Sequence, residues 1–185
     1  MRIYKYPNKE LWDEISSRPR LDLTKLNETV SNVLNDIRQR GDEAVKEYEL
    51  KFDKAELTNL AVSETEMDEA EKLVSNELRD AIILAHHNIK VFHISQRFVG
   101  QKVKTQEGVT CWQKSVAIER VGLYIPGGTA PLFSTVLMLA TPAKIAGCKE
   151  IVLCTPPNKE GKVNPAILVA ARIAGVSKIY KIGGV

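Results

Sequence analysis

A regular alternation of strand-like and helix-like segments in the last third of the chain constrains the fold more than any other feature. Three short apolar runs are rich in β-branched residues, as is typical of buried strands: 120–125 (RVGLYI), 151–155 (IVLCT) and 178–182 (KIYKI). Helical patterns over about 131–146 and 164–174 separate these runs. Because the connections are short, this order predicts right-handed crossovers on a parallel sheet.

Local signals support this arrangement. Pro126-Gly127-Gly128 ends the first strand, and Asn164 followed by Pro165 is typical of an N-cap and a first helical residue. Thr141-Pro142 predicts an interruption of the first helix, because proline removes a backbone donor. The predicted fold class is therefore α/β, with a helical N-terminal region followed by an incomplete Rossmann-like parallel sheet in the order β-α-β-α-β.

The chain changes character near residue 100, from helical and charge-rich to strand-rich and apolar. We expect a helix-rich region over 1–110 and a Rossmann-like nucleotide-binding half domain over 111–185. Helix starts are predicted with N-caps at Thr24 and Asp42, with a capping box at Ser63 and Glu66, and after Ser75.

The longest predicted helix and the segment after it have distinct patterns. The helix carries an apolar stripe that predicts one buried face: Leu78, Ile82, Ala85, Ile89 and Phe92. Alternating residues around Glu107-Gly108 then predict a short hairpin over 101–114.

Net charge and the distribution of apolar residues exclude several classes of partner. Lys and Arg exceed Asp and Glu by 26 − 23 = 3, and this excess is too dispersed for a nucleic-acid-binding face. No apolar run is long enough to span a bilayer, and the N-terminus lacks the apolar core of a signal peptide. We therefore expect a cytoplasmic protein that binds neither nucleic acid nor membranes.

The cysteine and histidine residues form no recognisable metal site in the sequence. Cys111, Cys148 and Cys154 contain no C-x-x-C pair, so free thiols in a reducing compartment are expected. His86 and His93 share a helix face at a spacing of seven, whereas metal-binding pairs on one helix usually sit three or four residues apart. The residues themselves therefore assign no catalytic or metal-binding position.

One turn is a candidate ligand site. The segment 124–131 (YIPGGTAP) follows the first predicted strand, at the end of the sheet where α/β proteins bind ligands. Its glycines allow backbone amides to approach a phosphate, and the start of the next helix adds a favourable dipole. The segment is not G-x-G-x-x-G, so two interpretations stay open: a ligand-binding turn, or simply a tight strand-to-helix connection.

Three segments resemble the histidinol dehydrogenase family. The longest is 121–157 (VGLYIPGGTAPLFSTVLMLATPAKIAGCKEIVLCTPP), and the others are 40–53 (RGDEAVKEYELKFD) and 179–184 (IYKIGG). Members of that family are considerably more than twice this length. The resemblance therefore implies that the chain is the N-terminal portion of such a protein, truncated within its Rossmann-like half domain.

The resemblance implies an NAD-dependent, zinc-requiring oxidation of L-histidinol to L-histidine through an aldehyde, within histidine biosynthesis and in a homodimer. It also implies that Tyr124, which precedes the Pro-Gly-Gly turn, contacts NAD. The family's zinc ligands and its acid–base Glu–His pair lie beyond Val185 in family order. We therefore expect this chain alone to be inactive and to bind no zinc.

Two alternatives belong to other functional classes. The chain is alternatively a stand-alone, non-catalytic nucleotide-binding module, or an interaction module whose open sheet edge docks to another chain. The third predicted strand, 178–182, is expected to present an uncovered edge and apolar faces, which favour self-association.

Overall fold

The elements of the structure follow most of the periodicity and capping signals of the sequence. The computed structural model describes residues 3–18, 23–128 and 130–184. The helices are α1 (Trp12–Ser16, preceded by a 3-10 turn at Lys9–Leu11), α2 (Thr24–Arg40), α3 (Asp42–Phe52), α4 (Glu64–Leu73), α5 (Asn76–Ser95), α6 (Phe133–Ala146) and α7 (Pro165–Ala174). The strands are β1 (Lys102–Gln106), β2 (Val109–Trp112), β3 (Arg120–Tyr124), β4 (Glu150–Thr155) and β5 (Lys178–Lys181).

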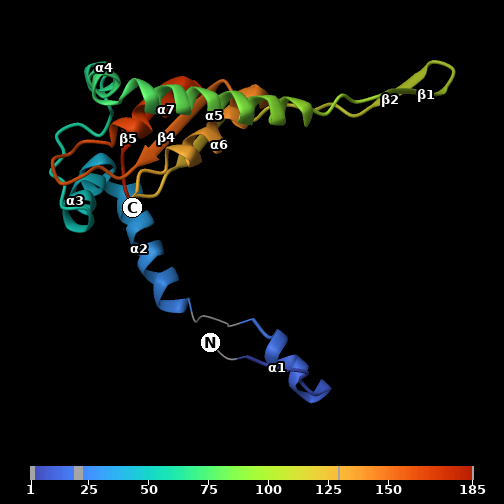
Figure 1. The fold of residues 1–185 in the computed structure, drawn as a ribbon, viewed down its shortest axis with the longest axis horizontal. Coiled ribbons are helices and arrows are strands. Elements are labelled where there is room, and N and C mark those ends of the chain that lie inside the picture. Colours follow the sequence, from blue (N-terminus) through green and yellow to red (C-terminus); the bar gives the residue numbers. More distant parts are fainter. Residues whose placement is uncertain (1–2, 19–22, 129, 185) are drawn as a thin grey trace.

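Figure 1 shows a body of helices and strands from which two parts project. One is an arm formed by α2 and α1, and the other is the antiparallel hairpin of β1 and β2, which extends α5. The hairpin confirms the prediction around Glu107-Gly108. Within the described ranges, no helix is long and apolar enough to cross a membrane.

The body is built around a parallel sheet with the order β3-β4-β5, which confirms the predicted fold class. Each crossover contains one helix, α6 after β3 and α7 after β4. In the register of the sheet, Tyr124 lies beside Cys154, and Cys154 lies beside Tyr180. The carboxyl ends of the strands therefore meet at one edge of the body.

The sheet separates two apolar clusters. The larger contains buried residues of α4, α5, α6, α7, β4 and β5. The smaller lies between α3 and the segment that follows α3. Because successive residues of a strand face opposite sides, Ile179 belongs to the larger cluster and Tyr180 packs against the smaller one. The N-terminal helices thus help to bury both faces of the sheet.

The outer edge of β5 is covered by an N-terminal segment. The Val62 N–H donates to the Ile179 carbonyl at 3.0 Å, and the Lys181 N–H donates to the Leu60 carbonyl at 2.7 Å. An antiparallel bridge connects the two segments between these bonds. The prediction of an uncovered edge at the third strand is therefore wrong, because a segment more than a hundred residues away in sequence satisfies its backbone groups.

The predicted caps at three helix starts are confirmed. Ser63 and Glu66 form the capping box, with the Glu66 N–H donating to Ser63 Oγ and the Ser63 N–H donating to Glu66 Oε2 at 2.9 Å. Asn164 Oδ1 accepts from the Ala166 N–H at 2.9 Å and caps α7. Ser75 Oγ accepts from the Leu78 N–H at the start of α5.

Other local predictions are wrong. Thr24 and Asp42 are the first residues of α2 and α3 rather than their N-caps. Phe92 is 61% exposed, because the apolar face of α5 extends beyond the helices that cover it. Helix α6 continues through Pro142. The carbonyl that loses its donor there belongs to Met138, which is exposed, so water can solvate the free group.

Substitutions of two aliphatic residues of α5 are expected to differ in their effect on stability. Ile82 is fully buried in the larger cluster, whereas Leu84 is 62% exposed. We expect Ile82→Ala to lower the free energy of unfolding by about 2–5 kcal/mol, because it leaves a cavity against α6 and α7. Leu84→Ala is the matched control and should cost less than about 1 kcal/mol. Chemical denaturation measures both, and equal losses would contradict this packing.

Candidate functional site

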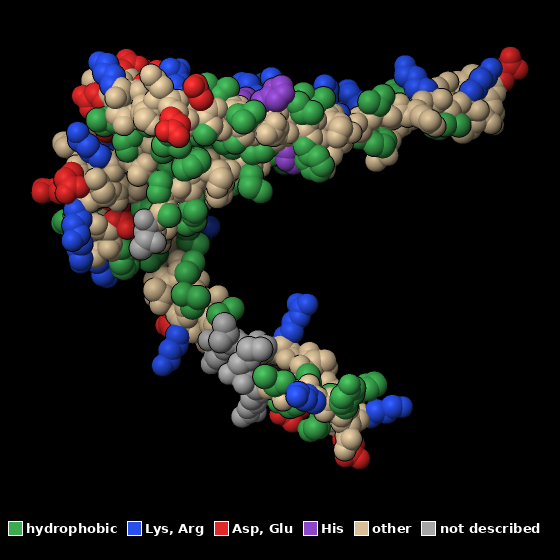
Figure 2. All heavy atoms as spheres, in the orientation of Figure 1, with side chains coloured by type: hydrophobic (Ala, Val, Ile, Leu, Met, Phe, Trp, Pro, Cys, Tyr) green, Lys and Arg blue, Asp and Glu red, His purple; other side chains and the backbone are tan. Residues whose placement is uncertain are grey.

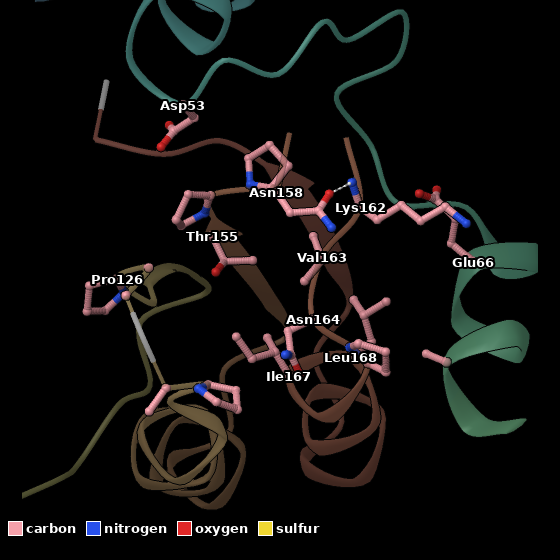
Figure 3. A pocket seen from close by; sticks show the side chains of 18 of the residues that line it. Asp53, Glu66, Pro126, Thr155, Asn158, Lys162, Val163, Asn164, Ile167 and Leu168 are labelled. Atoms are coloured by element: carbon pink, nitrogen blue, oxygen red, sulfur yellow. Dashed lines mark hydrogen bonds between the residues drawn. The ribbon is translucent and has the colours of Figure 1, made fainter. Parts of the chain in front are cut away.

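A pocket of about 700 Å³ lies at the carboxyl ends of the parallel strands. Its walls come from the turn after β3 (Tyr124, Pro126–Gly128), the segment after β4 (155–158), the start of α7, and Gly184 after β5. Asp53 and Glu66 add side chains from the N-terminal helical region. Figure 3 shows Asp53 across the pocket from Asn164 at the start of α7. Open α/β sheets bind their ligands at this end.

The turn after β3 needs glycine for steric reasons. A Cβ atom on Gly127 would lie 2.6 Å from Pro156 Cγ, so the two loops can approach this closely only without a side chain there. Gly128 has φ +157°, and space beside it is open. The backbone of this turn is therefore exposed to the pocket, where its polar groups are available to a ligand.

The start of α7 gives one end of the pocket a positive potential. The helix dipole favours negatively charged groups at its N-terminal end, although the Asn164 cap already uses the Ala166 N–H there. Lys162 also lines the pocket just before the helix. Asn158 orders this connection, because its Oδ1 accepts from the Lys162 N–H at 2.8 Å and from the Glu160 N–H at 3.1 Å. This end of the pocket therefore suits a phosphate.

Glu66 and Lys181 form an ion pair beside the pocket. Lys181 Nζ donates to Glu66 Oε1 at 2.8 Å, and both side chains are largely buried. Burial raises the pKa of Glu66, but the hydrogen bonds from Lys181 and Ser63 outweigh it and the pKa is lowered overall. Both Glu66 oxygens thus have protein partners, and the pair connects the start of α4 to β5.

A second carboxyl group is fully buried close to the pocket. Glu49 of α3 is 0% exposed, and its Oε1 accepts from the Gly183 N–H at 2.7 Å. The pKa of Glu49 is raised to about 7: burial is the largest cause, the Gly183 N–H opposes it, and the charge and hydrogen bonding of Asp53 add to the rise. Among the described residues, Glu49 Oε2 and Asp53 Oδ2 are buried without a hydrogen-bond partner.

One proton explains both unpartnered oxygens. A protonated Glu49 can donate from Oε2 to the Asp53 carboxylate while its Oε1 still accepts from the Gly183 N–H. The fit is tight, since a Cβ atom on Gly183 would collide with Asp53 Oδ2. The two acids therefore hold the turn after β5 against the end of α3.

Tyr124, the cofactor-contact residue expected from the sequence, lies at this pocket. Its side chain is 47% exposed, so it is not a core element. Burial raises the pKa of the Tyr124 hydroxyl, and the negative charges of Asp53 and Glu49 raise it further. Tyr124 therefore lies close enough to the two acids for their charges to affect its hydroxyl.

The remaining candidate residues, the possible metal ligands and the three cysteines, do not form a site in the described part of the chain. The described residues contain no group of three or more His, Cys, Asp or Glu side chains that could hold a metal ion. Cys111, Cys148 and Cys154 are free thiols, and burial raises the pKa of Cys154, which disfavours the reactive thiolate. Sequence patterns did not indicate Glu49 or Asp53, because acidic residues within a charged helix are usually solvated.

The sheet and its pocket define an α/β protein with a parallel sheet and a pocket at the carboxyl ends of the strands. The family model for histidinol dehydrogenase matches residues 16–185. The chain belongs to the histidinol dehydrogenase family.

Individual histidinol dehydrogenases are also similar to the chain. The chain is 67% identical over 185 residues to a histidinol dehydrogenase of Bacteroides fragilis, covering 100% of the chain and 43% of that protein. It is 46% identical over 172 residues to that of Escherichia coli K12, covering 92% of the chain and 39% of the relative. The crystal structure of histidinol dehydrogenase from Elizabethkingia anophelis superposes with a TM-score of 0.89 at 48% identity, covering 96% of this chain and 41% of that one. The chain thus spans less than half the length of these relatives.

The raised pKa of Glu49 predicts a pH-dependent stability. A pKa of about 7 lies above the ordinary value of 4.5, so the folded chain binds this proton more tightly than the unfolded chain. The stabilisation is full below about pH 4.5 and is lost as the pH rises through about 7. Glu49→Gln retains an acceptor for the Gly183 N–H and a donor for Asp53. We expect this variant to lose less stability than the wild type between pH 5 and pH 8.

Melting temperatures across this pH range test the expectation. Glu43→Gln is the control, since it removes an exposed carboxylate from the same helix and should retain the wild-type pH dependence. Parallel curves for Glu49→Gln and the wild type would show that Glu49 does not titrate as described.

Proposed function

We propose that the chain forms part of an NAD-dependent, zinc-requiring histidinol dehydrogenase, which oxidises L-histidinol to L-histidine, and that its pocket binds NAD. The close approach of the Gly127 turn to Pro156, opposite the start of α7, is the observation that carries the proposal. This arrangement exposes the backbone of the glycine turn to a ligand phosphate, beside the positive end of the α7 dipole. Family membership supplies the reaction class.

In this proposal the residues of the chain bind and orient the cofactor. The start of α7 and Lys162 hold the pyrophosphate, and the ring of Tyr124 packs against part of the dinucleotide. Gly127 lets the backbone come close enough to exclude water from the phosphates. NAD supplies the hydride acceptor for both oxidation steps when it is bound.

Zinc does not fit the described part of this chain, which offers no suitable group of ligands. We therefore propose that the zinc ligands and the acid–base residues belong to parts of the whole protein that this chain does not contain. Residues 1–185 alone are then not expected to oxidise histidinol or to retain zinc.

A homodimer in the cytoplasm completes the proposal. Helix α2 has no buried residue, and its apolar stripe is exposed: Leu26, Val30 and Leu34. Figure 2 shows hydrophobic side chains along this arm and on the facing side of the body. An exposed stripe of this kind is typical of an interface with another chain.

The NAD proposal is tested in the full-length enzyme with Tyr124→Ala. A cofactor contact predicts that the KM for NAD rises while the melting temperature of the unliganded enzyme stays nearly unchanged, because the exposed ring contributes little to the core. Tyr124→Phe is the control, since it retains the ring and should keep most of the affinity. A loss of stability of about 3–5 kcal/mol with unaltered NAD dependence would instead make Tyr124 a core residue.

A further inference from the structure

Asp53 is a carboxylate of the pocket that Glu49 occupies only in part. It follows α3 directly and lines the same pocket as Tyr124. Its Oδ2 is buried against Gly183 and is the oxygen that the Glu49 proton reaches, whereas none of the described residues forms a hydrogen bond to its Oδ1. Glu66, which also lines the pocket, has both oxygens bound by Lys181 and Ser63. Of these two half-buried acids, Asp53 is the one with capacity for a ligand.

Glu49 holds this carboxylate in place. Glu49 is fixed by the Gly183 N–H, and its proton provides one hydrogen bond to Asp53. An ionised carboxylate has about four acceptor positions on its two oxygens, so the others remain available to hydroxyl groups of a ligand. A site of this kind is preorganised, because its supporting partner is itself buried and bonded.

The pocket has opposite charge preferences at its two ends. The start of α7 with Lys162 favours anions, whereas Asp53 across the pocket repels anions and accepts from hydroxyl donors (Figure 3). A dinucleotide offers both groups, a pyrophosphate and ribose hydroxyls. The reacting nicotinamide ring has to lie beside the substrate. The zinc that is proposed to hold the substrate finds no group of ligands among the described residues. The half of the dinucleotide that this chain holds is therefore the adenosine half.

Resting on the proposed NAD site, we propose that the Asp53 carboxylate binds the hydroxyls of the adenosine ribose and makes the enzyme select NAD over NADP. Two hydroxyls donate to the carboxylate in charge-assisted hydrogen bonds. A 2′-phosphate removes one donor and places a second negative charge beside Asp53 and Glu49. Specificity thus includes a repulsive element against the phosphorylated cofactor.

Asp53→Asn in the full-length enzyme tests this proposal. Asparagine retains an oxygen for the Glu49 proton but removes the charge. We expect the KM for NAD to rise about tenfold or more with kcat little changed, because a charge-assisted hydrogen bond is weakened. The ratio of kcat/KM for NAD to that for NADP should fall at least tenfold. Isothermal titration with each cofactor gives the same ratio without turnover.

The control is Glu56→Gln, which removes an exposed carboxylate three residues along the same segment and outside the pocket. It should leave the NAD-to-NADP ratio unchanged, both in kcat/KM and in the affinities from isothermal titration. Because the NAD-to-NADP ratio is internal to each variant, it remains decisive even where Asp53→Asn lowers the melting temperature. An unchanged ratio in a variant that binds NAD overturns the role of Asp53. Failure of the wild-type enzyme to bind either cofactor would instead overturn the proposed NAD site.

Discussion

A parallel sheet has to be covered on both faces and at its edges, and three strands with two crossover helices cannot do this alone. Here the N-terminal helical region supplies the missing cover. Helices α4 and α5 pack onto α6 and α7, α3 and the following segment cover the other face, and residues 60–62 pair with the outer edge of β5. The sheet therefore depends on contacts between parts of the chain that are distant in sequence.

The same contacts build the pocket. Covering β5 brings the end of α3 to Gly183 and the start of α4 to Lys181, so Asp53 and Glu66 reach the carboxyl ends of the strands. A crossover unit alone would offer only its glycine turn and the dipole at the start of α7. The acidic side of the pocket is a consequence of how the N-terminal helices close the sheet.

Features that depend on residues close together in the sequence could be predicted, and features that depend on distant residues could not. The strand–helix alternation, the Ser63 capping box and the Asn164 cap are local, so their residue patterns are sufficient. Glu49 acquires its role only from a partner 134 residues away, and no periodicity signals such a contact. Pro142 and Phe92 were mispredicted because local rules take no account of which face tertiary packing leaves in solvent. Tyr124 was placed by resemblance, since strand alternation alone left its direction open.

Amide hydrogen exchange in the full-length enzyme, with and without NAD, tests most directly whether this pocket is the cofactor site. The account predicts that NAD slows exchange at Gly127 and Gly128, at Gly183, and over the first turn of α7, and leaves the β1–β2 hairpin unchanged. These amides come from segments that only the folded pocket brings together. NAD binding that leaves all of them unprotected, while protecting amides elsewhere in the enzyme, would contradict it.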